Sequence, residues 1–220
     1  MSHCRSNADS LGDRPEGIRQ LLIVTCDADV ADPVLGLLHL RTTATDLNRV
    51  IRDMRFAFLA DCPEAMPKIA SWYFDQWGHL RPNASPKDIE SKLHSFLNHD
   101  EIPLLILAFD NEELMGVAQL KLHEMDVFPE KEHWLGGVYV PVKHRGKGIA
   151  SQLIRQACRT ARSLGVATLF LQTENLEGGL YTNLGWVPVA QAKNHGLDVL
   201  VMEKLLDEKG PDRASTISER

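Results

Sequence analysis

The chain has 220 residues, of which 44% are hydrophobic and 25% are charged. These values exclude a disordered or fibrous protein and predict one globular core with an appended segment. The formal net charge of −6 argues against nucleic acid as a partner, because phosphate recognition needs a positively charged face.

The first 53 residues are predicted to form an extension outside the main domain, partly disordered. Residues 1–17 are rich in Ser, Asp, Asn, Arg and Gly and lack periodic apolar positions, which is typical of disorder. Apolar clusters at residues 21–24 and 34–40 allow a short strand and a short helix. All apolar runs are shorter than the roughly 20 residues that cross a bilayer, so no membrane partner is predicted.

Met54 stands directly before a strand-like run at residues 55–59. The compact domain is therefore predicted to occupy residues 54–206, with a polar C-terminal tail at residues 207–220. An upstream start codon would account for the extra residues at the N-terminus.

Two helices are predicted after the first strand. Residues 63–78 carry apolar side chains at helical spacing and end at a glycine suited to a C-cap. In the second helix Ser85 is the expected N-cap and Pro86 the first helical residue, with apolar positions continuing to Leu97.

The rest of the domain alternates strands with helices. Residues 104–109 and 114–122 read as a hairpin, and residues 134–140 as a further strand. A helix from Ile149, closed by Gly165, and a strand at residues 167–173 complete a βαβ unit with parallel strands. After them the sequence predicts a short helix at 180–184 and strands at 186–190 and 199–205. The fold class is therefore α/β (α+β), with a mixed, mostly antiparallel sheet, a central parallel strand pair and helices on both faces.

The loop between the strand at 134–140 and the helix from Ile149 has the features of a phosphate site. Glycines at 146 and 148 lack Cβ, so successive N–H groups can turn toward one concavity at a helix N-terminus, where an anion is favoured. Arg145 and Lys147 strengthen the positive field.

Two common nucleotide motifs are excluded for this loop. A Walker A motif needs Ser or Thr after Gly-Lys, but Gly148 follows Lys147, and Pro141 replaces the leading glycine. A dinucleotide fingerprint fails because Ser151 stands where its third glycine belongs. The sequence therefore predicts a pyrophosphate ligand other than ATP or NAD.

The loop resembles that of the GNAT family, the Gcn5-related N-acetyltransferases, which reads Arg or Gln, two residues, Gly, one residue, Gly or Ala. Arg145, Gly148 and Ala150 match it. The downstream segment 180–186, Leu-Tyr-Thr-Asn-Leu-Gly-Trp, is similar to the family's aromatic-Tyr-x-x-Leu-Gly-aromatic element. The resemblance covers residues 54–205 and implies acetyl-CoA as the cosubstrate, with no metal.

The resemblance also implies which residues bind the cosubstrate. Backbone groups of the strand before the loop would face the pantetheine and thioester, and Asn175 would contact CoA, although its spacing to Tyr181 is one residue shorter than usual. The implied cofactor-binding residues are Val138, Tyr139, Val140, Arg145, Gly146, Lys147, Gly148, Ile149, Ala150 and Asn175.

Tyr181 is the predicted general acid. A free phenol titrates near ~10 and a thiol near ~8.5, so a nearby tyrosine can protonate the departing thiolate. The alternative is a core tyrosine packed beside Leu180 and Trp186.

Glu132 is the predicted general base, acting directly or through water. His123, Glu124, Asp126 and His133 remain alternatives, and water alone also remains. The acidic residues near this position, which include Glu130, favour a cationic acceptor.

Other conspicuous residues have simpler interpretations. The histidines at 123, 133 and 195 are not in a metal-ligand pair. Trp72, Tyr73 and Trp77 fit a core stripe better than an acceptor groove, and Cys158 fits a packing role better than a nucleophile. The four scattered cysteines form no CxxC pair, which suits the cytoplasm.

Two functions are consistent with the sequence. The first is an N-acetyltransferase that moves acetyl from acetyl-CoA to a primary amine of a small molecule or peptide by direct attack in a ternary complex. The second is a catalytically inactive CoA-binding regulatory or interaction module. Either would act as a monomer or homodimer.

Overall fold

A computed structural model of the chain describes residues 54–81 and 83–206. The predictions for the N-terminal extension, including its two apolar clusters, and for the C-terminal tail lie outside these residues. Within them, no helix has both the length and the apolar character needed to cross a membrane.

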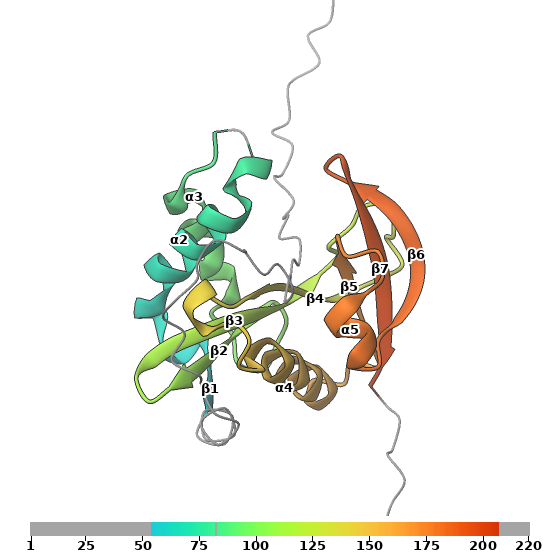
Figure 1. The fold of residues 1–220 in the computed structure, drawn as a ribbon. Helices are drawn as coiled ribbons and strands as arrows, with labels where there is room; N and C mark the ends of the chain where they lie inside the picture. The colour runs from blue at the N-terminus through green and yellow to red at the C-terminus, as the bar shows by residue number, and fades with distance from the viewer. Residues whose placement is uncertain (1–53, 82, 207–220) are drawn as a thin grey trace, which may run out of the picture.

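A single seven-stranded sheet organises the described residues, in the order β1-β2-β3-β4-β5-β7-β6 (Figure 1). All neighbours are antiparallel except β4 and β5, which confirms the predicted mixed sheet with a parallel pair at its centre. The strands are β1 (Arg55–Phe58), β2 (Leu104–Asp110), β3 (Glu113–Leu122), β4 (His133–Tyr139), β5 (Thr168–Thr173), β6 (Val187–Asn194) and β7 (Leu197–Leu205).

Helices cover both faces of this sheet, as predicted (Figure 1). The α-helices are α2 (Met66–Trp77), α3 (Pro86–Leu93), α4 (Ile149–Ser163) and α5 (Gly179–Asn183). Short 3-10 turns are η1 (Leu59–Asp61), η2 (Pro63–Ala65), η3 (Gly78–Leu80), η4 (His94–Phe96) and η5 (Val142–His144). Helices α2 and α3 pack on one face, and α4 packs on the other.

The alternation of β2 explains how one sheet serves two cores. Leu104 and Ile106 face the core built with α4, whereas Leu105 and Leu107 face the core built with α2 and α3. Because helices cover both faces, the whole strand is apolar rather than alternating with polar residues. With both of its faces buried, β2 lies next to β3 in the left half of Figure 1.

Local sequence signals set the helix ends. The Ser85 hydroxyl accepts the Asp88 N–H at 3.3 Å, and the Asp88 carboxylate accepts the Ser85 N–H at 2.8 Å, so α3 begins with a capping box. Gly78 does end α2, but with right-handed φ −60° rather than the left-handed cap. Glycine suits this position because a Cβ would stand 2.9 Å from the Phe74 ring.

The last two strands are longer than predicted. They join at His195 and Gly196, which both have positive φ (49° and 83°), as a two-residue type I′ hairpin requires. The tight turn extends the pairing from Val187↔Glu203 to Asn194↔Leu197.

Candidate functional site

A β-bulge interrupts β4 close to its end. Val117 pairs with Tyr139 and Gln119 pairs with Gly136, so Gly137 and Val138 together oppose the single residue between them on β3. Gly137 has φ +54°, a left-handed conformation that favours glycine. Bulges of this kind redirect the backbone and its neighbours, often beside functional sites.

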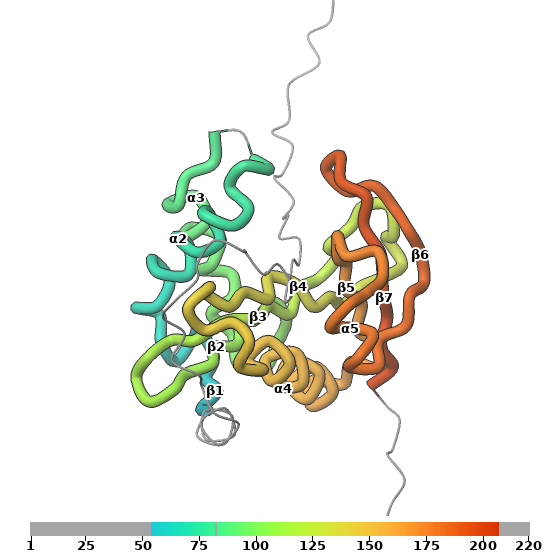
Figure 2. The backbone as a smooth tube through the Cα atoms, viewed as in Figure 1, coloured from blue at the N-terminus to red at the C-terminus, as the bar shows by residue number. Residues whose placement is uncertain are grey.

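The two parallel strands meet only briefly. The register of β4 on β5 consists of the single pair Trp134↔Phe170, so past it the C-terminal parts of the two strands are not joined by a ladder. In Figure 2 the backbone half that contains β1 to β3 and the half that contains β6 and β7 diverge from the centre, where β4 and β5 lie. The bulge at Gly137 and Val138 therefore lies beside the gap between β4 and β5 that opens where their ladder ends.

Two buried side chains hold the bulge from the α2 side. Tyr73 is fully buried, and its hydroxyl donates to the Gly137 carbonyl at 2.8 Å. Gln119 is also fully buried, and neither atom of its amide has a hydrogen-bond partner of good geometry among the described residues. Burial disfavours the phenolate and raises the pKa of Tyr73 well above its usual value, a shift that the neighbouring Gln119 amide only partly opposes. Tyr73 is therefore a neutral hydrogen-bond donor that positions the bulge.

The loop after β4 presents a row of unused donors. Within residues 54–81 and 83–206, no backbone carbonyl accepts a hydrogen bond from the N–H groups of residues 146–151. Gly146 and Gly148 have φ +72° and +74°, and a Cβ on Gly146 would meet no atom within 4 Å. The N–H groups thus surround open space at the N-terminus of the 15-residue α4. This arrangement fits a phosphate group.

Contacts on both sides of the loop fix its conformation. Arg145 Nε donates to the Val140 carbonyl at 3.0 Å, which ties the start of the loop to the end of β4. Glu113, at the tip of the β2–β3 hairpin, accepts a hydrogen bond from Lys143 and lies 3.2 Å from the buried His144. The Lys143 hydrogen bond lowers the pKa of Glu113, which keeps this carboxylate charged beside the loop.

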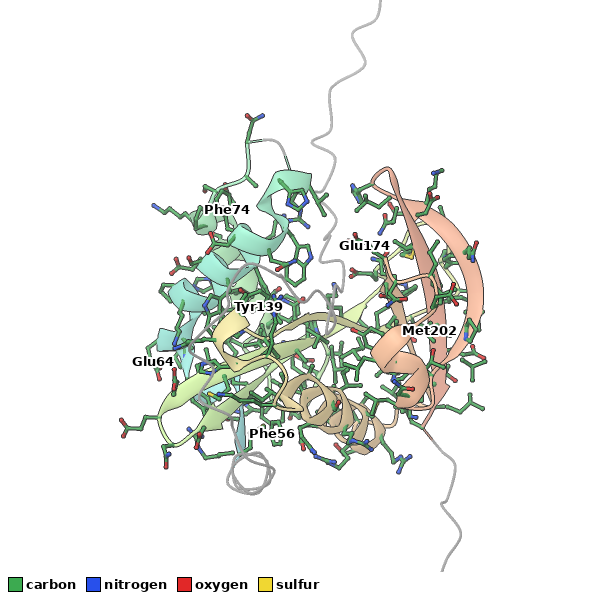
Figure 3. All side chains as sticks on the ribbon, viewed as in Figure 1. Phe56, Glu64, Phe74, Tyr139, Glu174 and Met202 are labelled. Atoms are coloured by element: carbon green, nitrogen blue, oxygen red, sulfur yellow. The ribbon has the colours of Figure 1, made fainter. Side chains whose placement is uncertain are left out.

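Tyr139 lies between α2 and the loop, as Figure 3 shows. Its ring centroid is 5.4 Å from that of Trp72 and 6.1 Å from that of Trp77. The side chain is half-buried and packs against the core on the α2 and α3 face. Trp77 and Tyr73 are core residues, as the stripe predicted.

Tyr181 lies in the middle of the five-residue α5, whose N-cap Gly178 and first residue Gly179 both have positive φ. Its side chain is 1% exposed and belongs to the core on the α4 face. The ring meets Trp186 edge-on at 6.2 Å. The predicted packing beside Trp186 is therefore present, and the role of the hydroxyl stays a prediction.

Two other predicted residues, Glu132 and Asn175, are exposed. Glu132 precedes β4, so roughly 15 Å of extended strand separates it from the bulge; its carboxylate lies 3.7 Å from His133. Asn175 is exposed, and its side-chain oxygen accepts the Glu177 N–H at 3.0 Å. Both assignments stay predictions.

Two of the acidic residues that favoured a cationic acceptor, Glu124 and Glu130, form ion pairs with lysines. Glu124 is buried and pairs with Lys121, which is fully buried, and it also accepts Gln172 Nε2 at 3.1 Å. Burial lowers the pKa of Lys121, while Glu124 opposes this shift. Glu130 pairs with Lys131 at 3.0 Å. Asp126 and Glu132 belong to the same acidic group, so the expectation of a cationic acceptor stays a prediction.

A pocket opens between α2, α3 and β3, on the side of the bulge opposite α4. Tyr73 and Gln119, the two residues that contact the bulge, form its floor together with Trp77. Among the described residues that line it, the charged ones are Arg81 and Lys92, and none carries a carboxylate. No local sequence signal marks this pocket, because its residues come from separate elements.

Cys158 in α4 is a packing residue, and we expect it to be unreactive. It packs against the core, and burial raises the pKa of its thiol to about 11. At pH 8 the thiolate fraction is then about a thousandth, so alkylation by iodoacetamide should be roughly a hundredfold slower than for a free cysteine. Peptide mass spectrometry of native and urea-unfolded protein measures this ratio; equal rates in both states would contradict it.

The geometry defines a class of protein: a mixed α/β fold whose central parallel strands part beside a bulge and a phosphate-type loop. Comparison with known proteins agrees. Residues 66–186, more than half of the chain, match the acetyltransferase (GNAT) family. The chain belongs to the GNAT acetyltransferase family.

Solved structures show the same fold. A protein from Salmonella typhimurium, yncA, whose structure holds its cofactor acetyl-CoA, matches with TM-score 0.56 and 19% identity over 73% of this chain and 99% of its own. Aminoglycoside 6′-acetyltransferase type Ii matches with TM-score 0.54 and 18% identity, over 69% and 97%. Spermidine/spermine N-acetyltransferase from Vibrio cholerae matches with TM-score 0.52 and 18% identity, over 71% and 95%. A search of curated proteins finds no significant match.

Proposed function

We propose that the protein is an N-acetyltransferase that moves the acetyl group of acetyl-CoA to a primary amine of a small molecule or peptide. The observation that carries this proposal is the row of unpaired N–H groups at residues 146–151 beside the bulge at Gly137. Family membership supports the acetyl transfer, and the amine acetyltransferases among the similar structures are consistent with an amine acceptor.

On the donor side, the chain's own groups suit the two ends of the cosubstrate. Acetyl-CoA supplies an anionic diphosphate and a reactive thioester. The N–H groups of residues 146–151, with Lys147 and the guanidinium of Arg145, bind the diphosphate at the start of α4. The β4 backbone at Val138 lines the gap toward β5, where it orients the rest of the molecule.

On the acceptor side, direct attack needs an amine held across the gap from the thioester. The nitrogen lone pair forms the new bond to the acetyl carbon as the carbon–sulfur bond breaks, and the amine proton passes to a base while the sulfur receives one from an acid. Backbone N–H groups near the bulge are the donors that stabilise the charge developing on the carbonyl oxygen. Tyr73 keeps this geometry by holding the Gly137 carbonyl.

Glu132 remains the proposed base. Because about five residues of β4 separate it from Gly137, a proton from the acceptor reaches this carboxylate only through ordered water. Its exposure to solvent is compatible with such a relay.

Replacing Tyr181 by phenylalanine should lower kcat by about 10²-fold while leaving CoA affinity unchanged. The ring packing against Trp186 is retained, and the hydroxyl that is the proposed proton donor is removed, a contribution typically worth this much or more. Steady-state kinetics and calorimetric titration of CoA measure the two quantities. An unchanged kcat would leave Tyr181 with a packing role alone.

The proposed function is tested in two steps. CoA at about a hundred times its Kd should first raise the Tm by several degrees, by mass action. Release of free thiol from acetyl-CoA is then followed across a panel of amines and peptides, with the acetyl mass gain identified on the acceptor. Binding without turnover would favour the inactive module, and absence of binding would contradict both functions. Whether the active species is a monomer or a homodimer stays a prediction.

A further inference from the structure

We propose that the pocket between α2, α3 and β3 binds the acceptor by a carboxylate that the acceptor carries in addition to its amine. The inference rests on the proposed function and names the substrate class of that same site. It is carried by the position of the pocket, by the charge of its lining and by one unsatisfied buried amide.

The pocket has the position of an acceptor site. Its floor residues Tyr73 and Gln119 approach Gly137 closely, since a Cβ built there would stand 2.9 Å from the Tyr73 hydroxyl and 2.8 Å from the Gln119 amide carbon. A molecule seated on them therefore adjoins the bulge from the face opposite α4. The phosphate-type loop begins α4 on the other face, so donor and acceptor approach the bulge from opposite sides.

The charges at the pocket are mostly positive. Arg81 and Lys92 line it, and Lys121 lies behind them on the same face of β3 as Gln119. Among the described residues, the buried Glu124 pairs with Lys121 and also acts on Arg81, and Asp88 acts on Lys92. The two charged side chains that line the pocket itself, Arg81 and Lys92, are both positive.

The other charged groups near Lys92 do little to stabilise its positive charge. Its pKa is lowered, first by burial and then by the nearby charge of Arg81. Asp88 opposes this shift, but its exposed carboxylate is held by the Ser85 cap. A bound anion would relieve the repulsion between Arg81 and Lys92.

Gln119 provides the independent sign of a ligand. Its side chain is 0% exposed, yet neither amide atom has a hydrogen-bond partner of good geometry among the described residues. Buried amides without partners are rare and costly in native proteins. A carboxylate in the pocket accepts from the amide N–H₂ and from the planar guanidinium of Arg81 together, an arrangement that arginine is suited to make.

The test compares acceptors that differ only in this charge. Each α-amino acid of a panel is paired with its carboxamide, and kcat/KM is measured by thiol release. We expect the carboxylate member to be favoured at least about tenfold, through KM, since a hydrogen bond to a charged group is worth that much. Lys92→Glu should remove or reverse the preference. Lys87→Glu, an exposed lysine of the same helix outside the pocket lining, should retain it.

A second measurement separates this inference from the proposed function. The products N-acetyl-leucine and N-acetyl-leucinamide are titrated calorimetrically into the full chain saturated with CoA, which requires no turnover. Tighter binding of the carboxylate by wild type but not by Lys92→Glu supports the pocket assignment even if every amine fails as a substrate. Turnover or product binding that is indifferent to the carboxylate would overturn the inference and leave the N-acetyltransferase proposal intact.

Discussion

Replacing Gly137 by alanine is expected to reduce kcat/KM by about 10²-fold and to lower the Tm. The residue has φ +54°, which costs a side chain about 1–2 kcal/mol. The new Cβ would also lie 2.8–2.9 Å from Gln119 and Tyr73, which are fully buried and cannot swing into solvent. Overpacking of this kind costs about 1–3 kcal/mol, and displacement of the bulge moves the reacting groups apart.

Gly165→Ala is the matched control for this substitution. Gly165 has φ +82°, but a Cβ there would meet nothing within 4 Å, and it lies at the far end of α4. Its variant should lose about 1–2 kcal/mol of stability with unchanged kinetic constants. Thermal unfolding and kinetics below both Tm values distinguish the two effects. A Gly137→Ala enzyme with wild-type kcat/KM would mean that the bulge is not at the reaction centre.

The second large effect is expected from the loop variant Arg145→Glu with Gly148→Val. Charge reversal removes a charge-assisted contact worth about 1.5–3 kcal/mol, and valine is strongly strained at the φ of +74° found at Gly148. Together they should weaken CoA binding by at least about 10²-fold, as measured by calorimetry. The single variant Arg145→Glu should lose about tenfold.

The control for charge is Arg159→Glu, an exposed arginine further along α4 whose side chain contacts Gln156. It changes the net charge identically and should keep the Kd within about twofold, because solvent screens distant charges. Circular dichroism checks that the loop variants are folded. If the double variant binds CoA as tightly as the wild type does, the diphosphate is held elsewhere.

Local signals were enough to predict most of the fold. The Ser85-Pro86 start of α3, the Gly165 end of α4 and the hairpin between β2 and β3 depend on residues close in sequence, and the structure confirms them. The parallel pairing of β4 with β5 was predicted from the strand, helix, strand order of a βαβ unit. The extended β6–β7 hairpin was missed because His195-Gly196 is a less familiar turn pair than Asn-Gly.

The candidate site also has one part that local sequence predicts and another part that it does not. Residues 145–150 form one continuous segment, so their glycine and charge pattern is sufficient to predict the loop. Gly137, Tyr73 and Gln119 come from three elements, and nothing near any one of them in sequence marks a bulge or its support. The pairing of Glu124 with Lys121 and its hydrogen bond from Gln172 exist only in the folded chain, so the acidic stretch around position 124 did not reveal them.

The sequence by itself determined the order of elements, the parallel centre of the sheet and the glycine-containing loop before α4, because each depends on backbone preferences within one short stretch. Tertiary structure alone decided where the strands part, which tyrosine holds the bulge and which charged side chains line the pocket between α2, α3 and β3. These properties arise from side chains brought together across 64 residues, as in the bond from Tyr73 to Gly137, and burial then removes the solvent that would otherwise screen them.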